Sequence, residues 1–426
     1  MLVLRGARVI DPSCGLDEVA DVVIEAGRIS RVGRDAGKGL AGEQVRVLEL
    51  AGRWVVPGFV DLHSHFREPG YEYKEDIASG LRAAAAGGFT GVCVMPNTKP
   101  VNDTRAITEM MMARGKAAAG PRLYPFAAAT VGSAGEQLTE MGDLRDAGAI
   151  GVSDDGRCLM NAAVMRAALE YARTFDMLFS QHCEDHNLTA GAQMHEGHVS
   201  TRMGLQGWPR AGEDVIVARD LILAELTGAR YHVAHVSSLG AVRLLREAKA
   251  RGLSVSAEVT PHHLMLTHDA LLGFDTACKV NPPLREPEDI AALREALRDG
   301  TIDCIATDHA PHSALEKECE FAAASPGMIG LEPAVPVLLD LVREGILSPM
   351  RLVEALSTKP ARLGKLEGGT LKPGSAADIA VIDPERRWTI NPASLASRSS
   401  NTPFLNKEVR GKAILTMVAG QIVYES

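Results

Sequence analysis

Between residues 57 and 363 the sequence alternates short apolar runs with alanine- and leucine-rich stretches of helical spacing. The apolar runs lie at 59–63, 89–95, 122–128, 149–153, 177–181, 229–235, 253–259 and 302–307. Strands that alternate with helices form a parallel sheet, and eight such units close a (β/α)8 barrel. The alternative is an open, doubly wound sheet, but no G-x-G-x-x-G opens a helix after the first run and no Walker-type GK[ST] occurs. We therefore expect an α/β fold, with a (β/α)8 TIM barrel.

The two ends of the chain have a different pattern, in which apolar and polar residues alternate between glycine-containing turns. This pattern is typical of short β-strands. It occurs at 2–11, 20–33 and 45–58, and again in the C-terminal GGTLKPGSAADIAVIDPERRWTI and GKAILTMVAGQIVYES. Because chain termini often lie close together, both ends are expected to join in one small antiparallel, β-sandwich-like domain. The predicted domains are 1–56 with 364–426, and the barrel at 57–363.

Charge and composition argue against several classes of function. The formal net charge is −9 and the isoelectric point is near 5.8, whereas a nucleic-acid-binding surface has to be basic. The N-terminal apolar stretch is too short for a signal peptide, and no apolar run approaches the length of a membrane span. Seven scattered cysteines without a Cys-x-x-Cys pair argue against a disulfide framework. We expect a cytoplasmic protein that binds neither nucleic acid nor membranes.

Polar side chains follow the predicted strands at their carboxyl ends, where the active sites of (β/α)8 barrels lie. In chain order these residues are His63, His65, Arg67, Asn97, Asp154, Asp155, His182, His235, Asn281, Asp308 and His312. His63 and His65 are one residue apart, so on a strand both imidazoles would point the same way. The spacing therefore predicts that several of these side chains converge at one mouth of the barrel.

Each of these residues also has a plain structural explanation. A single histidine is more often a hydrogen-bonded core residue than a ligand, Asp155 lies in turn-forming sequence, and Asp308 could cap a helix. Arg67 could form a surface ion pair with Glu68 or Glu72. These explanations do not account for four histidines and two aspartates at one rim of one barrel. Imidazole and carboxylate ligands suit Zn²⁺ or a similar divalent ion, so the pattern predicts a metal site.

Other polar residues receive weaker assignments. No role is assigned to the histidines in polar or helical contexts, His186, His195, His198 and His268. His232 is out of register with His235 and is expected to face the surrounding helices. Asp154 is expected to orient its loop, and 153–160 contains little to pack, which suggests a mobile lid. His262 and His263 follow the seventh run, and they either line the site or begin a helix.

Seven motifs in chain order resemble those of the bacterial class I dihydroorotases, within the cyclic amidohydrolase group of the metal-dependent amidohydrolase superfamily. They are DLHSHFREPG, AAAAGGFTGVCVMPNTKP, GVSDDG, HVAHVSS, KVNPPLR, ATDHAPH and SRSSNTPF. The resemblance implies one or two Zn²⁺ ions per subunit, held by His63, His65, Asp155, His182, His235 and Asp308. It implies catalysis by Asp308 and substrate contacts from His65, Arg67, Asn97, Asn281, His312, Pro326 and Gly327. The last two act through the backbone, although the family usually has an aromatic or another apolar residue at Pro326.

The activity that this resemblance implies is the reversible hydrolysis of (S)-dihydroorotate to N-carbamoyl-L-aspartate in pyrimidine biosynthesis. A metal-activated hydroxide would attack, with Asp308 as general acid and base. The nearest alternative is a hydantoinase or allantoinase, but these bridge two metals with a carboxylated lysine, and GAIGVSDDGR has none. Asp155 would take that place here.

The resemblance also implies partners and a non-enzymatic alternative. The family is commonly homodimeric, and some members associate with aspartate transcarbamoylase. An inactive homologue could serve only as the structural partner of that transcarbamoylase. Such a protein is expected to have lost metal ligands, whereas all six positions are filled here.

Overall fold

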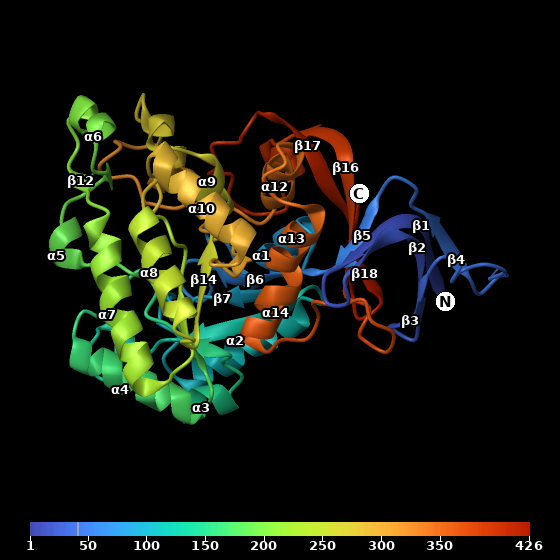
Figure 1. Cartoon of the computed structure of the whole chain (residues 1–426), viewed down its shortest axis with the longest axis horizontal. Coiled ribbons are helices and arrows are strands. Elements are labelled where there is room, and N and C mark those ends of the chain that lie inside the picture. Colours follow the sequence, from blue (N-terminus) through green and yellow to red (C-terminus); the bar gives the residue numbers. More distant parts are fainter. Residues whose placement is uncertain (41) are drawn as a thin grey trace.

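The computed structural model describes residues 1–40 and 42–426, and its centre is a closed parallel barrel (Figure 1). Neighbouring strands follow chain order: β6 (Phe59–Ser64), β7 (Phe89–Val94), β8 (Arg122–Ala127), β9 (Gly151–Val152), β10 (Leu178–Gln181), β13 (Tyr231–Val233), β14 (Val255–Val259) and β15 (Cys304–Ile305). The barrel closes where Ser64 pairs in parallel with His309, and the His65 N–H donates to the His309 carbonyl at 2.9 Å. Each of the eight predicted runs coincides with or overlaps one strand, so the predicted (β/α)8 barrel is confirmed.

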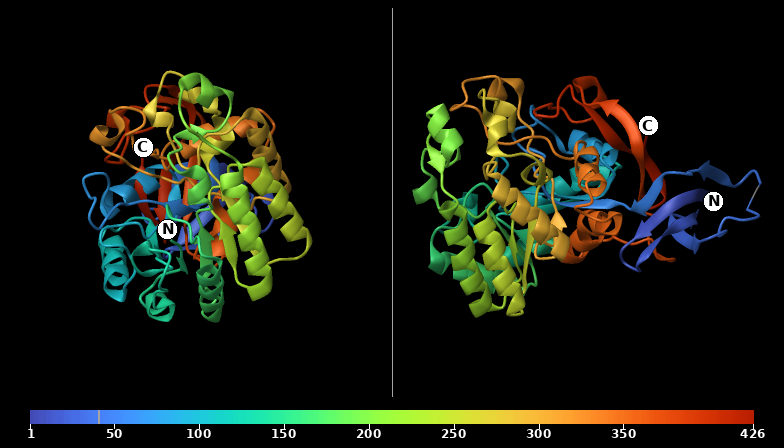
Figure 2. Two further views of the ribbon diagram at one scale, coloured as in Figure 1. Left: turned by 90° about the vertical axis from the view of Figure 1, so that its left-hand side faces the viewer. Right: turned by 45° about the horizontal axis from the view of Figure 1, so that its top comes forward.

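Helices surround the barrel strands (Figure 2). The main ones are α1 (Ile77–Ala86), α2 (Arg105–Ala117), α3 (Met141–Asp146), α4 (Ala162–Thr174), α7 (Ala211–Thr227), α8 (Leu239–Ala250), α10 (Pro287–Asp299), α12 (Ala334–Arg343), α13 (Pro349–Val353), the π-helical η4 (Glu354–Thr358) and α14 (Lys359–Gly364). Side chains cap several of them: Asp76 accepts from the Ser79 N–H at the start of α1, and Ser238 accepts from the Ala241 N–H at the start of α8. These caps fix where each helix leaves the preceding loop.

Short elements lie in the loops around the barrel. They are η1 (Val131–Ser133), α5 (His186–Thr189), β11 (Met194–His195), α6 (His198–Met203), β12 (Gly207–Trp208), α9 (Pro261–Met265), η2 (His268–Leu271), η3 (Thr276–Cys278), α11 (Ala314–Lys317) and η5 (Pro392–Ser394). The parallel pair of β11 and β12 was not predicted from the sequence. Two-residue strands contain no periodic pattern that could reveal them.

The barrel strands are buried on both faces. Every residue of β6 and β7 is buried, because one face lies inside the barrel and the other lies under helices. Asp61 is the one polar residue of β6 that precedes His63. Its carboxylate accepts from the N–H and Oγ1 of Thr307 at 2.8 and 2.6 Å and from Ser64 Oγ at 2.6 Å. These bonds tie β6 to the segment after β15, at the closing seam of the barrel.

The two ends of the chain meet in a second sheet, beside which both termini lie (Figure 1). Its strands are β1 (Leu2–Asp11), β2 (Leu16–Glu25), β3 (Arg28–Gly33), β4 (Arg46–Glu49), β5 (Trp54–Pro57), β16 (Ile379–Thr389), β17 (Glu408–Val418) and β18 (Gln421–Glu425). The joining of both ends is confirmed. The expectation of a purely antiparallel sheet was wrong, because β4 and β5 pair with β1 in parallel. The β2–β3 hairpin occupies one edge of β1, and β4 and β5 run along its other edge.

The second sheet packs directly against the barrel. Ile10 and Ala413 of the sheet belong to the same hydrophobic cluster as Phe59 and Phe89 of the barrel. Thr416 Oγ1 also donates to a carbonyl of α1 at 2.6 Å. Because one core is continuous through both parts, the predicted division into 1–56 with 364–426 and 57–363 stays a prediction.

Two further expectations concern cysteines and membranes. All seven cysteines are free, as their spacing predicted. Within residues 1–40 and 42–426, no helix combines the length and the apolar character that crossing a bilayer requires.

Candidate functional site

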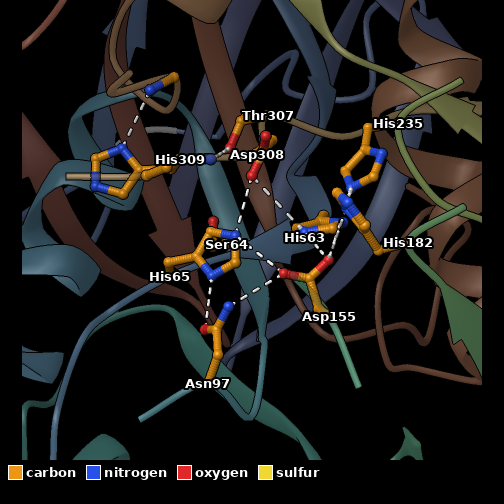
Figure 3. A network of polar contacts seen from close by, with 12 residues as sticks. His63, Ser64, His65, Asn97, Asp155, His182, His235, Thr307, Asp308 and His309 are labelled. Carbon is orange, nitrogen blue, oxygen red and sulfur yellow. Dashed lines mark hydrogen bonds and ion pairs between the residues drawn. The ribbon is translucent and has the colours of Figure 1, made fainter. Parts of the chain in front are cut away.

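Two histidines of β6 and its exit face two aspartates from distant parts of the barrel (Figure 3). His63 Nε2 lies 3.3 Å from Asp155 Oδ1 and 3.7 Å from Asp308 Oδ1. His65 Nε2 lies 3.0 Å from Asp308 Oδ1 and 3.6 Å from Asp155 Oδ2. All four side chains are buried. Thus the His-x-His pair and the carboxylates after β9 and β15 meet at one point.

A second pair of histidines reaches the same carboxylate from the other side. His182 Nδ1 lies 3.0 Å from His235 Nε2, and the two rings pack edge to face. His235 Nε2 is 3.6 Å and His182 Nδ1 is 4.0 Å from Asp155 Oδ1. Asp155 therefore lies between the two pairs of imidazoles. All six residues predicted to contact metal converge in the structure.

The spacing and chemistry of these atoms fit a divalent metal ion. Ligand atoms at 2.0–2.2 Å from a tetrahedral zinc ion lie about 3.3–3.6 Å apart, and the distances above span that range. His63 Nε2 and Asp155 Oδ1 are buried and make no hydrogen bond with any residue that the structure describes. Buried polar atoms without partners are costly, and a cation between them would remove that cost. The cluster can therefore hold a metal ion.

The outward-facing nitrogen of three imidazoles is fixed by an oxygen acceptor. His63 Nδ1 donates to Glu258 at 2.8 Å, and His65 Nδ1 donates to Asn97 Oδ1 at 2.9 Å. His182 Nε2 donates to Glu184 at 2.9 Å. Because each of these nitrogens carries the proton, the nitrogen that faces the cluster has a free lone pair. Metal-binding histidines are commonly oriented in this way.

The carboxylates of the cluster stay ionised. Burial alone would raise the pKa of Asp155, but the imidazole of His63 and its neighbours hold that pKa well below its usual value. Burial is outweighed in the same way at Asp308, where the neighbouring imidazoles of His65 and His63 lower the pKa. The pKa of Glu258 falls to about 2, because hydrogen bonds from His232 and His63 outweigh its burial. Two buried negative charges, Asp155 and Asp308, thus face the place where a cation would bind, and Glu258 adds a third behind His63.

Three residues of the site have left-handed backbone conformations. The φ angles are 61° at Arg67, 31° at His235 and 47° at Asp308. Side chains other than glycine rarely adopt such angles, and each instance costs about 1–3 kcal/mol. Strained residues of this kind cluster at functional sites. Their position supports the site independently of its donor atoms.

The residues predicted to bind substrate also lie around this cluster. Arg67 Nε donates to the Pro311 carbonyl at 3.2 Å, and Arg67 Nη2 lies 3.5 Å from His312 Nε2. His312 Nε2 donates to the Pro326 carbonyl at 2.9 Å. Arg67 forms no ion pair with any described residue, so the surface ion pair considered for it is absent. The structure brings these residues together as predicted, with the guanidinium available for a ligand.

The two predicted asparagines bind residues of the cluster. Asn97 Nδ2 donates to Asp155 Oδ2 at 3.2 Å, so its amide joins that carboxylate to His65. Asn281 Nδ2 donates to Glu184 at 3.3 Å, and Asn281 Oδ1 is buried without a hydrogen bond to the described residues. Asn281 therefore has a free acceptor, whereas both ends of the Asn97 amide are already paired.

Comparison with known proteins places this geometry in a family. The dihydro-orotase-like family matches residues 52–240, and the amidohydrolase family matches residues 217–424. A dihydroorotase of Anaeromyxobacter dehalogenans (strain 2CP-C) is 54% identical over 427 residues, which cover 100% of this chain and 98% of that protein. A dihydroorotase of Syntrophus aciditrophicus (strain SB) is 50% identical over 424 residues, with 100% and 99% covered. The chain belongs to the dihydroorotase family.

Solved structures of hydantoinases share the fold of this dihydroorotase-family chain. L-Hydantoinase (dihydropyrimidinase) from Arthrobacter aurescens has a TM-score of 0.87 at 26% identity, covering 100% of this chain and 96% of that one. D-Hydantoinase (dihydropyrimidinase) from Thermus sp. has a TM-score of 0.82 at 26% identity, with 100% and 95% covered. The likeness extends over the barrel and the sheet of both termini. Membership in the amidohydrolases makes this chain a hydrolase that acts on cyclic amides and depends on metal.

Two glutamates that orient the histidines were missed from the sequence. Glu258 is the only charged residue in the apolar run at 253–259, and it holds His63. Glu184 follows His182 by two residues and joins it to Asn281. A lone buried charge in a strand, and an acid beside a predicted ligand, are the signals that could have identified them.

The prediction for His232 was wrong. His232 Nδ1 bonds Ser256 Oγ at 2.8 Å, and its Nε2 lies 3.1 Å from Glu258, whose other oxygen binds His63. The side chain therefore lies against β14 beneath the cluster. The expectation assumes that the strand continues to His235, but β13 ends at residue 233 and His235 has a left-handed backbone. Alternation between faces does not extend past the end of a strand.

The remaining assignments concern the loops. Asp154 accepts from the N–H groups of Ala129 and Thr130 at 2.9 and 3.1 Å, so it orients its loop as expected. Mobility of 153–160 stays a prediction. His262 and His263, the two histidines after β14, lie in the short helix α9 (Pro261–Met265), and whether they also line the site stays open.

Proposed function

We propose that this chain catalyses the reversible hydrolysis of (S)-dihydroorotate to N-carbamoyl-L-aspartate, a step of pyrimidine biosynthesis. The observation that carries the proposal is the convergence of four imidazoles and two carboxylates beside Arg67, which has no ion-pair partner among the described residues. It occurs in a chain that is 54% identical to a dihydroorotase over its full length. A cationic side chain beside a hydrolytic centre suits a substrate with a carboxylate.

We assign the metal ligands of this site to the six converging residues. His63, His65 and Asp308 would form one position and His182 with His235 a second, with Asp155 between them. Zn²⁺, in one or two copies per subunit, suits these ligands. When bound, the metal would polarise the amide carbonyl and lower the pKa of a water ligand.

The side chains of the protein then perform two tasks. The Asp308 carboxylate is ionised, so it can accept the proton of the attacking water and return it to the departing ring nitrogen. In the direction of ring closure the same proton moves in reverse. The Arg67 guanidinium would bind the substrate carboxylate with two parallel hydrogen bonds, and Asn281 Oδ1 offers an acceptor. Asp308 is thus assigned as catalytic. The assigned substrate contacts are Arg67, Asn281, His312 and, through the backbone, Pro326 and Gly327, and the contacts from His65 and Asn97 stay predictions.

A hydantoinase-type activity is the second candidate, because the solved structures that resemble this chain include hydantoinases. The segment between residues 148 and 157 contains no lysine that could be carboxylated. We therefore expect Asp155 to take the place of that lysine among the ligands, and dihydroorotate to be preferred. The homodimer, the association with aspartate transcarbamoylase and the cytoplasmic location stay predictions.

The deciding experiment pairs metal analysis of the purified protein with three hydrolysis assays. We expect bound zinc, turnover of dihydroorotate and little turnover of hydantoin or allantoin. Preference for hydantoin would favour the second candidate. A metal-loaded protein that hydrolyses none of the three would overturn the proposal.

Arg67→Ala tests the substrate pocket. Loss of the guanidinium should raise KM for dihydroorotate by about 100-fold, because hydrogen bonds between charged groups contribute about 1.5–3 kcal/mol each. Bound metal should not change, since Arg67 is not among the converging donors. The matched control is Arg114→Ala, which removes an exposed arginine that pairs with Glu68 at 3.5 Å. Equal kinetics of the two variants would refute the assignment.

Glu258→Gln tests the orientation of His63. The substitution keeps the shape of the side chain but replaces the charged partner of His63 Nδ1 and His232. Metal affinity should fall by about 10–100-fold, as it does when such outer partners are lost. A competition titration against a coloured chelator measures this affinity. Glu247→Gln on the exposed face of α8 is the control, and the same affinity in both variants would contradict the role of Glu258.

A further inference from the structure

A segment of the C-terminal part of the chain contacts the loops at the barrel mouth. We call this segment, residues 396–402, the strap; it contains most of the motif SRSSNTPF. Two of its main-chain N–H groups donate to the buried carboxylate of Glu332 at 2.9–3.1 Å, and a third donates to the buried Glu75 at 3.1 Å. Ser399 Oγ donates to the Lys74 carbonyl at 2.8 Å. The strap is thus anchored to residues around the start of α1 and before α12.

Asn401, at the far end of the strap, connects two loops of the site. Its Oδ1 accepts from the His312 N–H at 3.1 Å, and its Nδ2 donates to the Ala310 carbonyl at 3.0 Å. The same Nδ2 donates to the Gly327 carbonyl at 3.1 Å. The main-chain carbonyl of Asn401 accepts from the Ile329 N–H at 3.0 Å. One amide side chain therefore bonds the loop after β15 and the loop at 325–330 together.

These two loops also meet directly at the predicted substrate contacts. His312 Nε2 donates to the Pro326 carbonyl, and because a carbonyl only accepts, that nitrogen carries the proton. His312 Nδ1 is left as a buried acceptor without a hydrogen bond to the described residues. From the other side, the buried Lys317 donates to the carbonyls of Ser325 and Gly327 at 2.8 and 3.0 Å. The direction of the free His312 lone pair therefore depends on the spacing of the two loops.

We propose that Asn401 is a positioning residue for substrate recognition, which fixes the loop of His312 against the loop of Pro326 and Gly327. The inference rests on the proposed function, since these three residues are its predicted substrate contacts. The place requires an amide, because it offers one N–H donor and two carbonyl acceptors. Aspartate has the same shape, but its carboxylate has no N–H to donate and would repel the carbonyl oxygens of Ala310 and Gly327.

The test compares Asn401→Ala, Asn401→Asp and the control Ser400→Ala. The Ser400 side chain, next in the strap, makes no hydrogen bond with the described residues. Each metal-loaded protein is assayed for kcat and KM with dihydroorotate, for bound metal, and for amide hydrogen exchange in peptides that cover 309–331. Exchange needs no substrate, so it reports on the loops even if the chain hydrolyses a different cyclic amide.

We expect Asn401→Ala to raise KM by about tenfold with kcat changed less than about threefold, as for a loss of binding rather than of chemistry. Asn401→Asp should raise KM further, and both should speed exchange at 309–331 with bound metal unchanged. Ser400→Ala should match the wild type. Unchanged exchange in Asn401→Asp would overturn the positioning role, and faster exchange with unchanged KM would overturn its link to recognition. No turnover of dihydroorotate by the wild type would instead refute the proposed function.

Discussion

Asp308→Asn should lower kcat for dihydroorotate hydrolysis by between about 10² and 10⁴-fold, the usual contribution of a general acid and base. The amide of asparagine keeps an oxygen near the position of Oδ1, which faces His65 and His63 at 3.0 and 3.7 Å. The neutral amide, however, cannot accept the proton of the attacking water. Five other donor residues of the cluster remain, so most of the bound metal should be retained. Steady-state kinetics and metal analysis of the same preparation measure both quantities.

Asp303→Asn is the matched control, because it makes the same substitution at the other end of the same strand. Asp303 precedes β15 and accepts from the Ala257 N–H at 2.9 Å, away from the metal cluster. Its kcat should stay within about twofold of the wild type, since the change leaves every donor of the site in place. If Asp308→Asn loses metal in the same proportion as activity, Asp308 acts only as a ligand. If kcat of Asp308→Asn equals that of the wild type, Asp308 has no role in the mechanism.

The barrel could be predicted because its strands are buried on both faces. Such strands appear in the sequence as uninterrupted apolar runs, and β6 and β7 are buried throughout. The pairing within the terminal sheet could not be predicted. Alternation shows which face of β1 is buried, but it does not show that β4 and β5 lie along its edge in parallel. That choice depends on contacts between segments distant in sequence.

The candidate metal ligands at the carboxyl ends of the barrel strands could be predicted for a related reason. Once the strands are placed, topology alone puts their carboxyl ends together, and His63, His235 and Asp308 follow at once. The partners that orient them could not be found in this way. Glu258 reaches His63 across 195 positions of sequence, and Glu184 lies in a loop. His232 shows the same limit, because its orientation depends on where β13 ends.

Removing the metal should abolish turnover and lower the free energy of unfolding by about 4 kcal/mol, measured against protein in free zinc at about 1,000 times its Kd. Without a cation, the four imidazoles keep lone pairs that face one another and the carboxylates Asp155 and Asp308. Burial disfavours a charged His63, but Asp155 raises its pKa well above the usual value, so a proton would partly replace the metal. Urea unfolding with and without zinc measures the difference, after a chelator has removed the metal.

Asp155→Ala provides the control for this prediction, because Asp155 lies between both pairs of imidazoles. Its unfolding free energy should depend less on zinc than that of the wild type, since both pairs of imidazoles lose a shared ligand, and the stability of the wild type should recover fully when zinc returns. Activity should recover together with stability in the wild type, since the same ion would hold the donors and promote hydrolysis. If the wild type, shown to be free of metal, keeps its stability and turns over dihydroorotate, the six side chains do not form a metal centre and the proposed mechanism fails.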